Sequence, residues 1–156
     1  SQADIVEAII ECSLTIELPV WLSISCVRDN QSNNIMLGYN DSIDSETHIY
    51  ESLDKAINKF SKKHGGPILI AHSDINVSGQ AVITAKKNFD GVLGVYPNKG
   101  YYEKPNWKFI DNITPSEYLE NAKSWLKNGA QIIGGCCGIG VEEIKALSEL
   151  KKLNQE

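Results

Sequence analysis

The stretch AQIIGGCCGIGVEEI, residues 130–144, decides how the rest of this chain is interpreted. It begins as a short apolar run typical of a strand, breaks at paired glycines, presents two adjacent cysteines and continues into a helical pattern. Adjacent cysteines rarely bridge each other, because disulfide geometry is narrow. Two thiolates at the end of a strand suit a soft metal such as zinc. The alternative is that Cys136 and Cys137 are buried thiols that pack as small hydrophobic side chains.

The composition is that of an ordinary globular protein. The chain has 156 residues, of which 42% are hydrophobic and 22% charged, so we expect one domain over residues 1–156. Its net charge is −5 with no basic run, which argues against nucleic acid and anionic membranes as partners. No apolar run reaches the length of a membrane span. The four cysteines lack the spacing of a disulfide framework, which predicts a cytoplasmic protein.

Strand patterns and helix patterns alternate along the chain. We expect strands at 20–26, 68–71, 92–96 and 130–133, and helices at 4–14, 45–62, 78–89, 114–129 and 141–150. Apolar strands that alternate with helices indicate a parallel sheet with right-handed crossovers, so the predicted fold class is α/β. Four such strand-helix units are half of a TIM-type (β/α)8 barrel.

The segments between these elements carry weaker signals. Residues 28–34 are polar and turn-prone, and residues 36–38 are expected to form an irregular or short paired segment. Residues 101–112 form a predicted aromatic loop, which is either a lid packed on the domain edge or a wall of a ligand site. The clearest helix start lies at Thr114, where Glu117 completes a capping box.

Polar and unusual residues gather where the predicted strands end. They are Cys26, His72-Ser73-Asp74, Tyr96-Pro97-Asn98 and Cys136-Cys137. In a (β/α) barrel the carboxyl ends of the strands form the face that carries the chemistry. No glycine-rich phosphate motif follows the first strand, which weakens a nucleotide-binding interpretation.

These segments together resemble the homocysteine S-methyltransferase family. Residues 134–138 (GGCCG) with residues 139–144 resemble the zinc motif at the C-terminus of that family's domain. Residues 19–23 (PVWLS) resemble its fifth strand and residues 94–100 (GVYPNKG) its seventh. The resemblance spans essentially the whole chain but only half of the family's domain. It implies the C-terminal half, about four strand-helix units, of a TIM-type (β/α)8 barrel.

The resemblance also implies a zinc ion held by three cysteines, two of which match Cys136 and Cys137. The third cysteine of the family closes its sixth strand, where this chain reads LIAHSD at 69–74. His72 takes that place in an ungapped match, and imidazole is a good zinc ligand. We therefore expect Cys136, Cys137 and His72 to bind zinc. Cys26 is the alternative third ligand.

The activity implied by the resemblance is transfer of a methyl group to the thiol of homocysteine, which gives methionine. Zinc would activate the thiol, the partners would be homocysteine and a small methyl donor, and Asn98 would line the substrate site. The family's Ser/Glu-type continuation after Asn98 is replaced here by Lys99 and Tyr101, so the sequence does not identify the donor.

The chain begins directly in a helical pattern, which predicts a fragment that lacks the N-terminal half barrel and is inactive alone. A half barrel exposes two sheet edges, so we also expect self-association through them. One alternative is a non-catalytic or degenerate metal-binding half-barrel module. A redox role of Cys136 and Cys137 is a weaker alternative, because they lack the Cys-x-x-Cys spacing of reversible disulfides.

Overall fold

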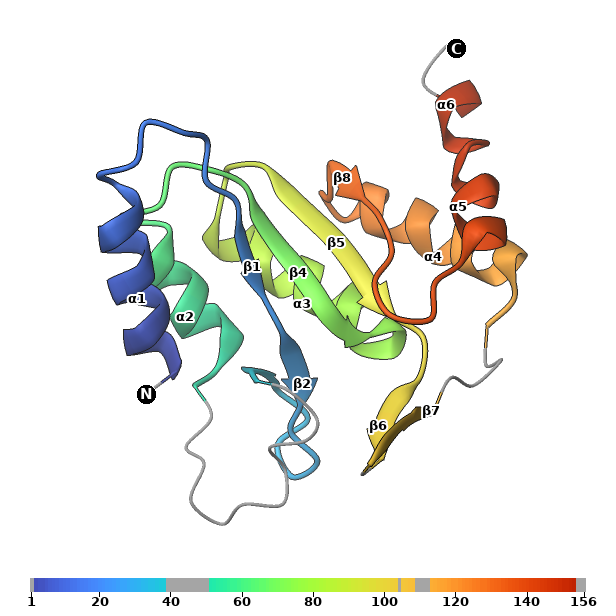
Figure 1. Cartoon of the computed structure of the whole chain (residues 1–156), viewed down its shortest axis with the longest axis horizontal. Helices are drawn as coiled ribbons and strands as arrows, with labels where there is room; N and C mark the ends of the chain where they lie inside the picture. The colour runs from blue at the N-terminus through green and yellow to red at the C-terminus, as the bar shows by residue number, and fades with distance from the viewer. Residues whose placement is uncertain (1, 39–50, 104, 109–112, 154–156) are drawn as a thin grey trace.

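Four parallel strands form the centre of the molecule. The structure is a computed structural model that describes residues 2–38, 51–103, 105–108 and 113–153. The strands lie side by side in the order β1 (Leu22–Ile24), β4 (Ile68–Asp74), β5 (Leu93–Asn98) and β8 (Ile132–Ile133), as Figure 1 shows. All three pairings are parallel. The prediction of an α/β fold with a parallel sheet is therefore confirmed.

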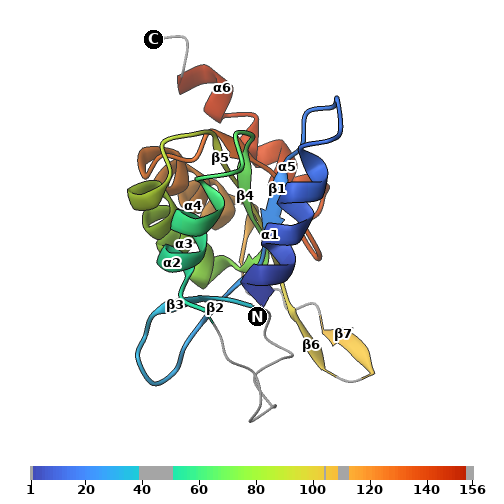
Figure 2. The ribbon, with the colours of Figure 1, turned by 90° about the vertical axis from the view of Figure 1, so that its left-hand side faces the viewer.

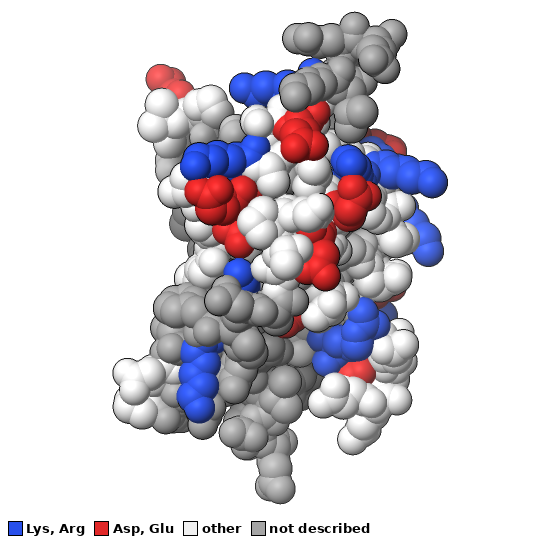
Figure 3. Space-filling view, turned by 90° about the vertical axis from the view of Figure 1, so that its right-hand side faces the viewer, with Lys and Arg blue, Asp and Glu red and all other residues white. Residues whose placement is uncertain are grey.

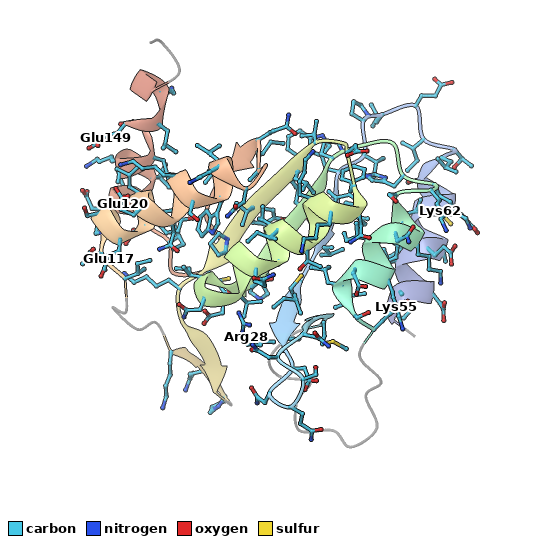
Figure 4. All side chains as sticks on the ribbon, turned by 180° about the vertical axis from the view of Figure 1, so that it is seen from behind. Arg28, Lys55, Lys62, Glu117, Glu120 and Glu149 are labelled. Carbon is cyan, nitrogen blue, oxygen red and sulfur yellow. The ribbon has the colours of Figure 1, made fainter. Side chains whose placement is uncertain are left out.

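Helices cover one face of this sheet. They are α2 (Leu53–Phe60), α3 (Ile75–Asn88) and α4 (Pro115–Lys127), which lie in front of the strands when the molecule is seen from the helix side (Figure 4). α1 (Gln2–Ser13) lies beside α2 near β1, whereas α5 (Val141–Leu147) and α6 (Leu150–Leu153) lie near β8 (Figure 1 and Figure 2). None of the described helices is both long enough and apolar enough to cross a bilayer.

The core lies between the sheet and these helices. Ile24, Ile70 and Val95 occupy one row across three strands, and all three are buried. They belong to the same apolar cluster as Phe60 of α2 and Trp125 of α4. Because successive side chains in a strand point to opposite faces, the register of the sheet directs this apolar row toward the helices.

The predicted strand over 20–26 is in fact two strands. β1 ends at Ile24, and β2 (Cys26–Arg28) pairs antiparallel with β3 (Ile35–Leu37). Met36 and Leu37 thus form the short paired segment expected from the sequence, and the polar residues before them form the turn of a hairpin.

The predicted helix over 45–62 is too long. α2 begins at Leu53 and ends at Phe60, and residues 45–50 lie outside the described part of the chain. β3 holds the two residues before α2 in an extended conformation: the Leu37 N–H donates to the Glu51 carbonyl at 2.8 Å, and Met36 forms an antiparallel bridge with Ser52.

The segment predicted as an aromatic loop over 101–112 contains a hairpin. β6 (Tyr101–Glu103) pairs antiparallel with β7 (Asn106–Lys108). Residues 109–112 and the aromatic side chains of the hairpin lie outside the described part, so the lid and the ligand wall both stay predictions.

The start of α4 is confirmed in detail. The Glu117 N–H donates to Thr114 Oγ1 at 3.2 Å, and the Thr114 N–H donates to Glu117 Oε2 at 2.8 Å. Gly129 follows the helix with a φ of 104°, a left-handed conformation that glycine adopts without strain. These caps fix where α4 ends and where the chain enters β8.

Candidate metal centre

Three side chains that can bind a metal meet at the carboxyl ends of the central strands. His72 Nδ1 lies 3.4 Å from Cys136 Sγ and 3.6 Å from Cys137 Sγ, and the two sulfur atoms are 3.8 Å apart. All three residues are half-buried. The fold therefore brings together the histidine and the two cysteines that were expected to bind zinc, from positions 64 and 65 residues apart.

β8 positions the cysteines because its backbone continues along β5 beyond the strand proper. This continuation has three hydrogen bonds: Gly134 N–H to Val95 O at 3.0 Å, Cys136 N–H to Pro97 O at 2.9 Å, and Lys99 N–H to Cys137 O at 2.7 Å. Figure 1 shows the segment after β8 running past the end of β5. A Cβ on Gly135 would lie 2.3 Å from Cγ2 of Ile139, so only glycine fits before the cysteines.

A bulge at the end of β4 directs His72 toward the cysteines. Between Ala71 and Asp74, two residues of β4 stand opposite one residue of β5. His72 adopts a left-handed φ of 47°, a conformation that costs a non-glycine residue about 1–2 kcal/mol. Ser73 anchors the bulge, because its hydroxyl accepts from the Cys26 N–H and donates to the Ala71 carbonyl, both at 2.8 Å.

The spacing of the three ligand atoms fits a tetrahedral metal. Zinc binds thiolate sulfur at about 2.3 Å and imidazole nitrogen at about 2.0–2.1 Å. In a tetrahedron those lengths separate two sulfur atoms by about 3.8 Å, and sulfur from nitrogen by about 3.6 Å. The observed separations are 3.8, 3.4 and 3.6 Å. Three such ligands leave a fourth position open for an exogenous group.

The surroundings of Cys137 favour its protonated thiol in the absence of a cation. Burial, together with the adjacent Cys136 thiol, raises the pKa of Cys137. A cation between the two sulfur atoms would reverse this effect, because a coordinated thiol loses its proton. The chemistry this arrangement supports is therefore the binding of a soft divalent cation at the strand ends.

Asn98 and Cys26, the other residues singled out from the sequence, lie outside this group. Asn98 is 7% exposed at the end of β5; its Nδ2 donates to the Gly100 carbonyl at 2.9 Å, and no donor among the described residues reaches its Oδ1. Cys26 is 4% exposed, and burial raises its pKa to about 12. Within the described part of the chain, His72 and not Cys26 approaches the cysteine pair.

Sequence reasoning missed a buried ion pair next to the cysteines. Lys99 Nζ lies 3.3 Å from Glu143 Oε1, and Glu143 Oε2 accepts from the Gly140 N–H at 2.9 Å. Burial opposes ionisation of Glu143, but the hydrogen bonds to its carboxylate and the Lys99 ammonium hold its pKa below the usual value. The position of Glu143 three residues after Gly140 was a usable signal for a helix cap. No local pattern connects it with Lys99, 44 residues earlier.

Tyr118 of α4 is a second contact that the sequence did not reveal. Its hydroxyl donates to the carbonyl of Gly134, and its ring packs edge-on against Trp125 with centroids 5.6 Å apart. Burial, and the negative charge of Glu143, raise the pKa of Tyr118, so the hydroxyl stays a donor. The helix before β8 thus supports the segment that carries the cysteines.

Known proteins with similar sequences point to one family. The family model for homocysteine S-methyltransferase matches residues 1–150. Homocysteine S-methyltransferase 2 of Zea mays is 25% identical over 145 residues, which are 91% of this chain and 38% of that protein. Homocysteine S-methyltransferase YbgG of Bacillus subtilis is 36% identical over 64 residues, which are 40% of this chain and 20% of that protein.

A third relative is selenocysteine methyltransferase of Astragalus bisulcatus. It is 23% identical over 140 residues, which are 88% of this chain and 37% of that protein. The chain thus spans about two fifths of the length of the curated relatives that it matches along most of its own length. Because the family model matches nearly the whole chain, this protein belongs to the homocysteine S-methyltransferase family.

Proposed function

We propose that this chain is the zinc-binding part of an enzyme that transfers a methyl group to the thiol of homocysteine and so forms methionine. Membership in the family supports methyl transfer to homocysteine. The observation that carries the proposal is the spacing of His72 Nδ1 and the Cys136 and Cys137 sulfur atoms, which matches three corners of a tetrahedral zinc site.

In this proposal His72, Cys136 and Cys137 hold the ion and leave one position for the substrate sulfur. Zinc would lower the pKa of the homocysteine thiol, which is otherwise about 8.5, so that the thiolate exists at neutral pH. The sulfur forms a bond to the methyl carbon while the donor's bond to that carbon breaks and its electron pair leaves with the donor. Asn98 is our candidate for contact with the substrate's amino-acid part, because its buried Oδ1 can accept from an N–H.

We further propose that the chain forms the C-terminal half of a TIM-type (β/α)8 barrel domain. Support comes from the four parallel strands in sequential order and from the helices on one face of the sheet. Of the described helices, none covers the face of β4 and β5 turned toward the viewer in Figure 1. In a closed barrel that face would be the interior. The free thiols of the four cysteines are consistent with the reducing cytosol as the compartment that we propose.

Self-association is part of the same proposal. Apolar side chains are exposed on the helices beside both edges of the sheet, with Ile9 of α1 56% exposed and Ile144 of α5 46% exposed. The β8 edge also has a cleft of about 590 Å³ between α4 and α5, and Figure 3 shows uncharged surface there between acidic and basic side chains. Two copies could cover these edges by pairing β1 of one copy with β8 of the other.

The first test is the zinc content of metal-replete protein, measured by elemental analysis. We expect about one zinc per chain in the wild type and in His64→Ala, and none in His72→Ala. His64 is a suitable control because it is a second histidine outside the group of three ligand residues, and its Nε2 lies 3.1 Å from the Pro67 carbonyl. Equal zinc in the wild type and His72→Ala would contradict His72 as a ligand. Absence of zinc from the wild type would contradict the metal centre.

The second test asks whether homocysteine reaches the ion. In the cobalt-substituted protein, homocysteine should strengthen the sulfur-to-cobalt charge-transfer absorption, because a third thiolate enters the coordination sphere. Homoserine, which has a hydroxyl in place of the thiol, is the matched control and should leave that band unchanged. Cobalt binding without any response to homocysteine would favour a non-catalytic metal-binding module.

A further inference from the structure

Lys99 and Glu143 form an ion pair that is almost completely buried. The Lys99 Nζ and Glu143 Oε1 atoms are 3.3 Å apart, and the two side chains are 9% and 8% exposed. The pair connects the residue after β5 with the first turn of α5. A second ion pair on α5, Glu142 with Lys145, has a separation of 2.8 Å but side chains that are 69% and 66% exposed. Adjacent residues of one helix thus form one surface pair and one interior pair.

The buried pair encloses the backbone that carries Cys137. The backbone N–H of Lys99 donates to the Cys137 carbonyl at 2.7 Å. The Glu143 side chain accepts, through Oε2, from the backbone N–H of Gly140 at 2.9 Å. Between these two contacts lies Gly138, with a left-handed φ of 79°. Glycine restricts the backbone less than any other residue. The conformation of residues 137–140 therefore depends on the contacts at both of its ends.

Stability alone is a weak reason to bury such a pair. Removing two charges from water costs free energy that their attraction often only offsets, and an apolar pair of similar volume is frequently at least as stable. A buried pair does impose a defined geometry, because each charge has to stay close to its partner. At this place in the fold, that geometry is the position of Cys137 relative to Cys136 and His72.

We propose that Lys99 and Glu143 are positioning residues that hold Cys137 in the geometry for binding the metal. This inference rests on the proposed function, because it presupposes that Cys136, Cys137 and His72 bind zinc. Groups that do not contact the metal but orient its ligands typically contribute about 10–100-fold to metal affinity. The pair would act in this way through the backbone of residues 137–140, which begins at the Cys137 carbonyl.

The test compares zinc affinity in two matched double variants. Lys99→Met/Glu143→Gln removes both buried charges at similar volume and keeps an acceptor for the Gly140 N–H. Glu142→Gln/Lys145→Met makes the same replacements in the exposed pair. Competition with a chromophoric chelator gives the Kd for Zn²⁺ alone, and the cobalt spectrum reports the coordination geometry. We expect the buried-pair variant to bind zinc at least about tenfold more weakly, with an altered cobalt spectrum. The surface-pair variant should match the wild type.

Two controls separate positioning from general stability. Lys99→Arg keeps the charge and should retain more zinc affinity than the double variant. Thermal unfolding of each metal-free protein measures stability directly. If the buried-pair variant lowers the metal-free Tm but binds zinc with the Kd and cobalt spectrum of the wild type, the pair is merely structural and the inference is wrong. A loss of affinity in both double variants also overturns it. A wild type that binds no zinc overturns the proposed function as well.

Discussion

The thiols of this chain lie in different surroundings, which determine what each can do. Cys136 and Cys137 are half-buried beside His72, whereas Cys26 is 4% exposed and belongs to the apolar core. Burial raises the pKa of Cys26 to about 12, so this thiol stays protonated far above neutral pH. Cys12 is exposed. Cys26 is therefore a core residue whose ionisation matters for stability.

Cys26 should make the metal-free protein less stable as the pH rises above about 9. The unfolded thiol loses its proton near pH 9.0, while the folded thiol keeps its proton up to about 12. The unfolded state then binds fewer protons, so the free energy of unfolding falls with pH by at most about 1.4 kcal/mol per unit. Urea titrations from about pH 8 to pH 10.5 should show wild type and Cys26→Ala converging in stability.

Cys12→Ala is the control for this experiment, because it removes an exposed thiol. Its stability should follow that of the wild type at every pH. Parallel curves for the wild type and Cys26→Ala would contradict the raised pKa of the buried thiol.

The bulge in β4 is the element that turns a strand end into part of a candidate site. Without the extra residue, the strand would continue its alternation and His72 would point to the face opposite Ala71. The bulge and the left-handed φ of His72 change that direction, and Ser73 ties the bulge to β2. The strain at His72 is thus associated with the direction of its side chain.

Glycine at position 72 should give a more stable metal-free protein than alanine. In the folded state a φ of 47° costs alanine about 1–2 kcal/mol and glycine little. In the unfolded state glycine has more conformational freedom, which lowers its free energy of unfolding by about 0.5–1 kcal/mol and offsets part of that advantage. Chemical denaturation should therefore give His72→Gly a free energy of unfolding about 0.5–1 kcal/mol above that of His72→Ala.

The same two replacements at His64 provide the control. Among the described residues, only Asn33 and His72 combine a positive φ with a side chain, so His64 lacks this strain. Alanine should be the more stable replacement at His64, because glycine only adds freedom to the unfolded chain there. If alanine is also more stable at position 72, the left-handed conformation is absent in solution.

The elements that the sequence predicts well are those with a local cause. Thr114 and Glu117 cap α4 within four residues of each other, and both hydrogen bonds of the predicted capping box are present. The start of α2 was mispredicted because it depends on a strand that is distant in sequence. The Glu51 carbonyl accepts from the Leu37 N–H of β3, which keeps the residues before α2 extended. Helical periodicity gave no sign that another strand would hold these residues.

The candidate site divides in the same way. Cys136, Cys137 and His72 were recognisable from residue type and from their places after apolar runs. The bulge that reorients His72 depends on its register with β5, which no short pattern encodes. The contact between Lys99 and Glu143 likewise forms only when the end of β5 and the start of α5 come together. Types of ligand were therefore predictable, but the groups that orient them were not.

The whole molecule has apolar surface at both ends of its sheet. Near β1 the exposed side chains include Ile5, Ile9 and Trp21, which are 64%, 56% and 54% exposed; near β8 they include Val141 and Ile144, which are 68% and 46% exposed. Within the described residues, no strand pairs with the outer edge of β1 or of β8. Parallel sheets rarely leave an edge or a face uncovered, so this surface favours association.

Both ends of the helix layer carry charges of both signs. Figure 4 shows Lys55 and Lys62 toward the β1 end and Glu117, Glu120 and Glu149 toward the β8 end. At the β1 end Lys59 and Lys63 also pair with Glu7 and Glu11 of α1, and at the β8 end Lys123 pairs with Glu120. Charge therefore does not select which ends meet. Closing eight parallel strands from two copies pairs β1 of one copy with β8 of the other, so the geometry of the sheet favours contact between unlike ends.

We therefore predict that this chain self-associates through unlike ends. Light scattering should give at least twice the mass of one chain. In a two-fold pair that closes eight strands, both interfaces join the β1 end of one copy to the β8 end of the other. Ile9→Lys alone therefore changes both interfaces, and so does Ile144→Lys alone. Each single variant should dissociate the pair. Asn30→Lys, in an exposed turn, is the control and should not. Dissociation by only one of the two isoleucine variants would indicate pairing of like ends, and a monodisperse wild-type monomer would contradict self-association altogether.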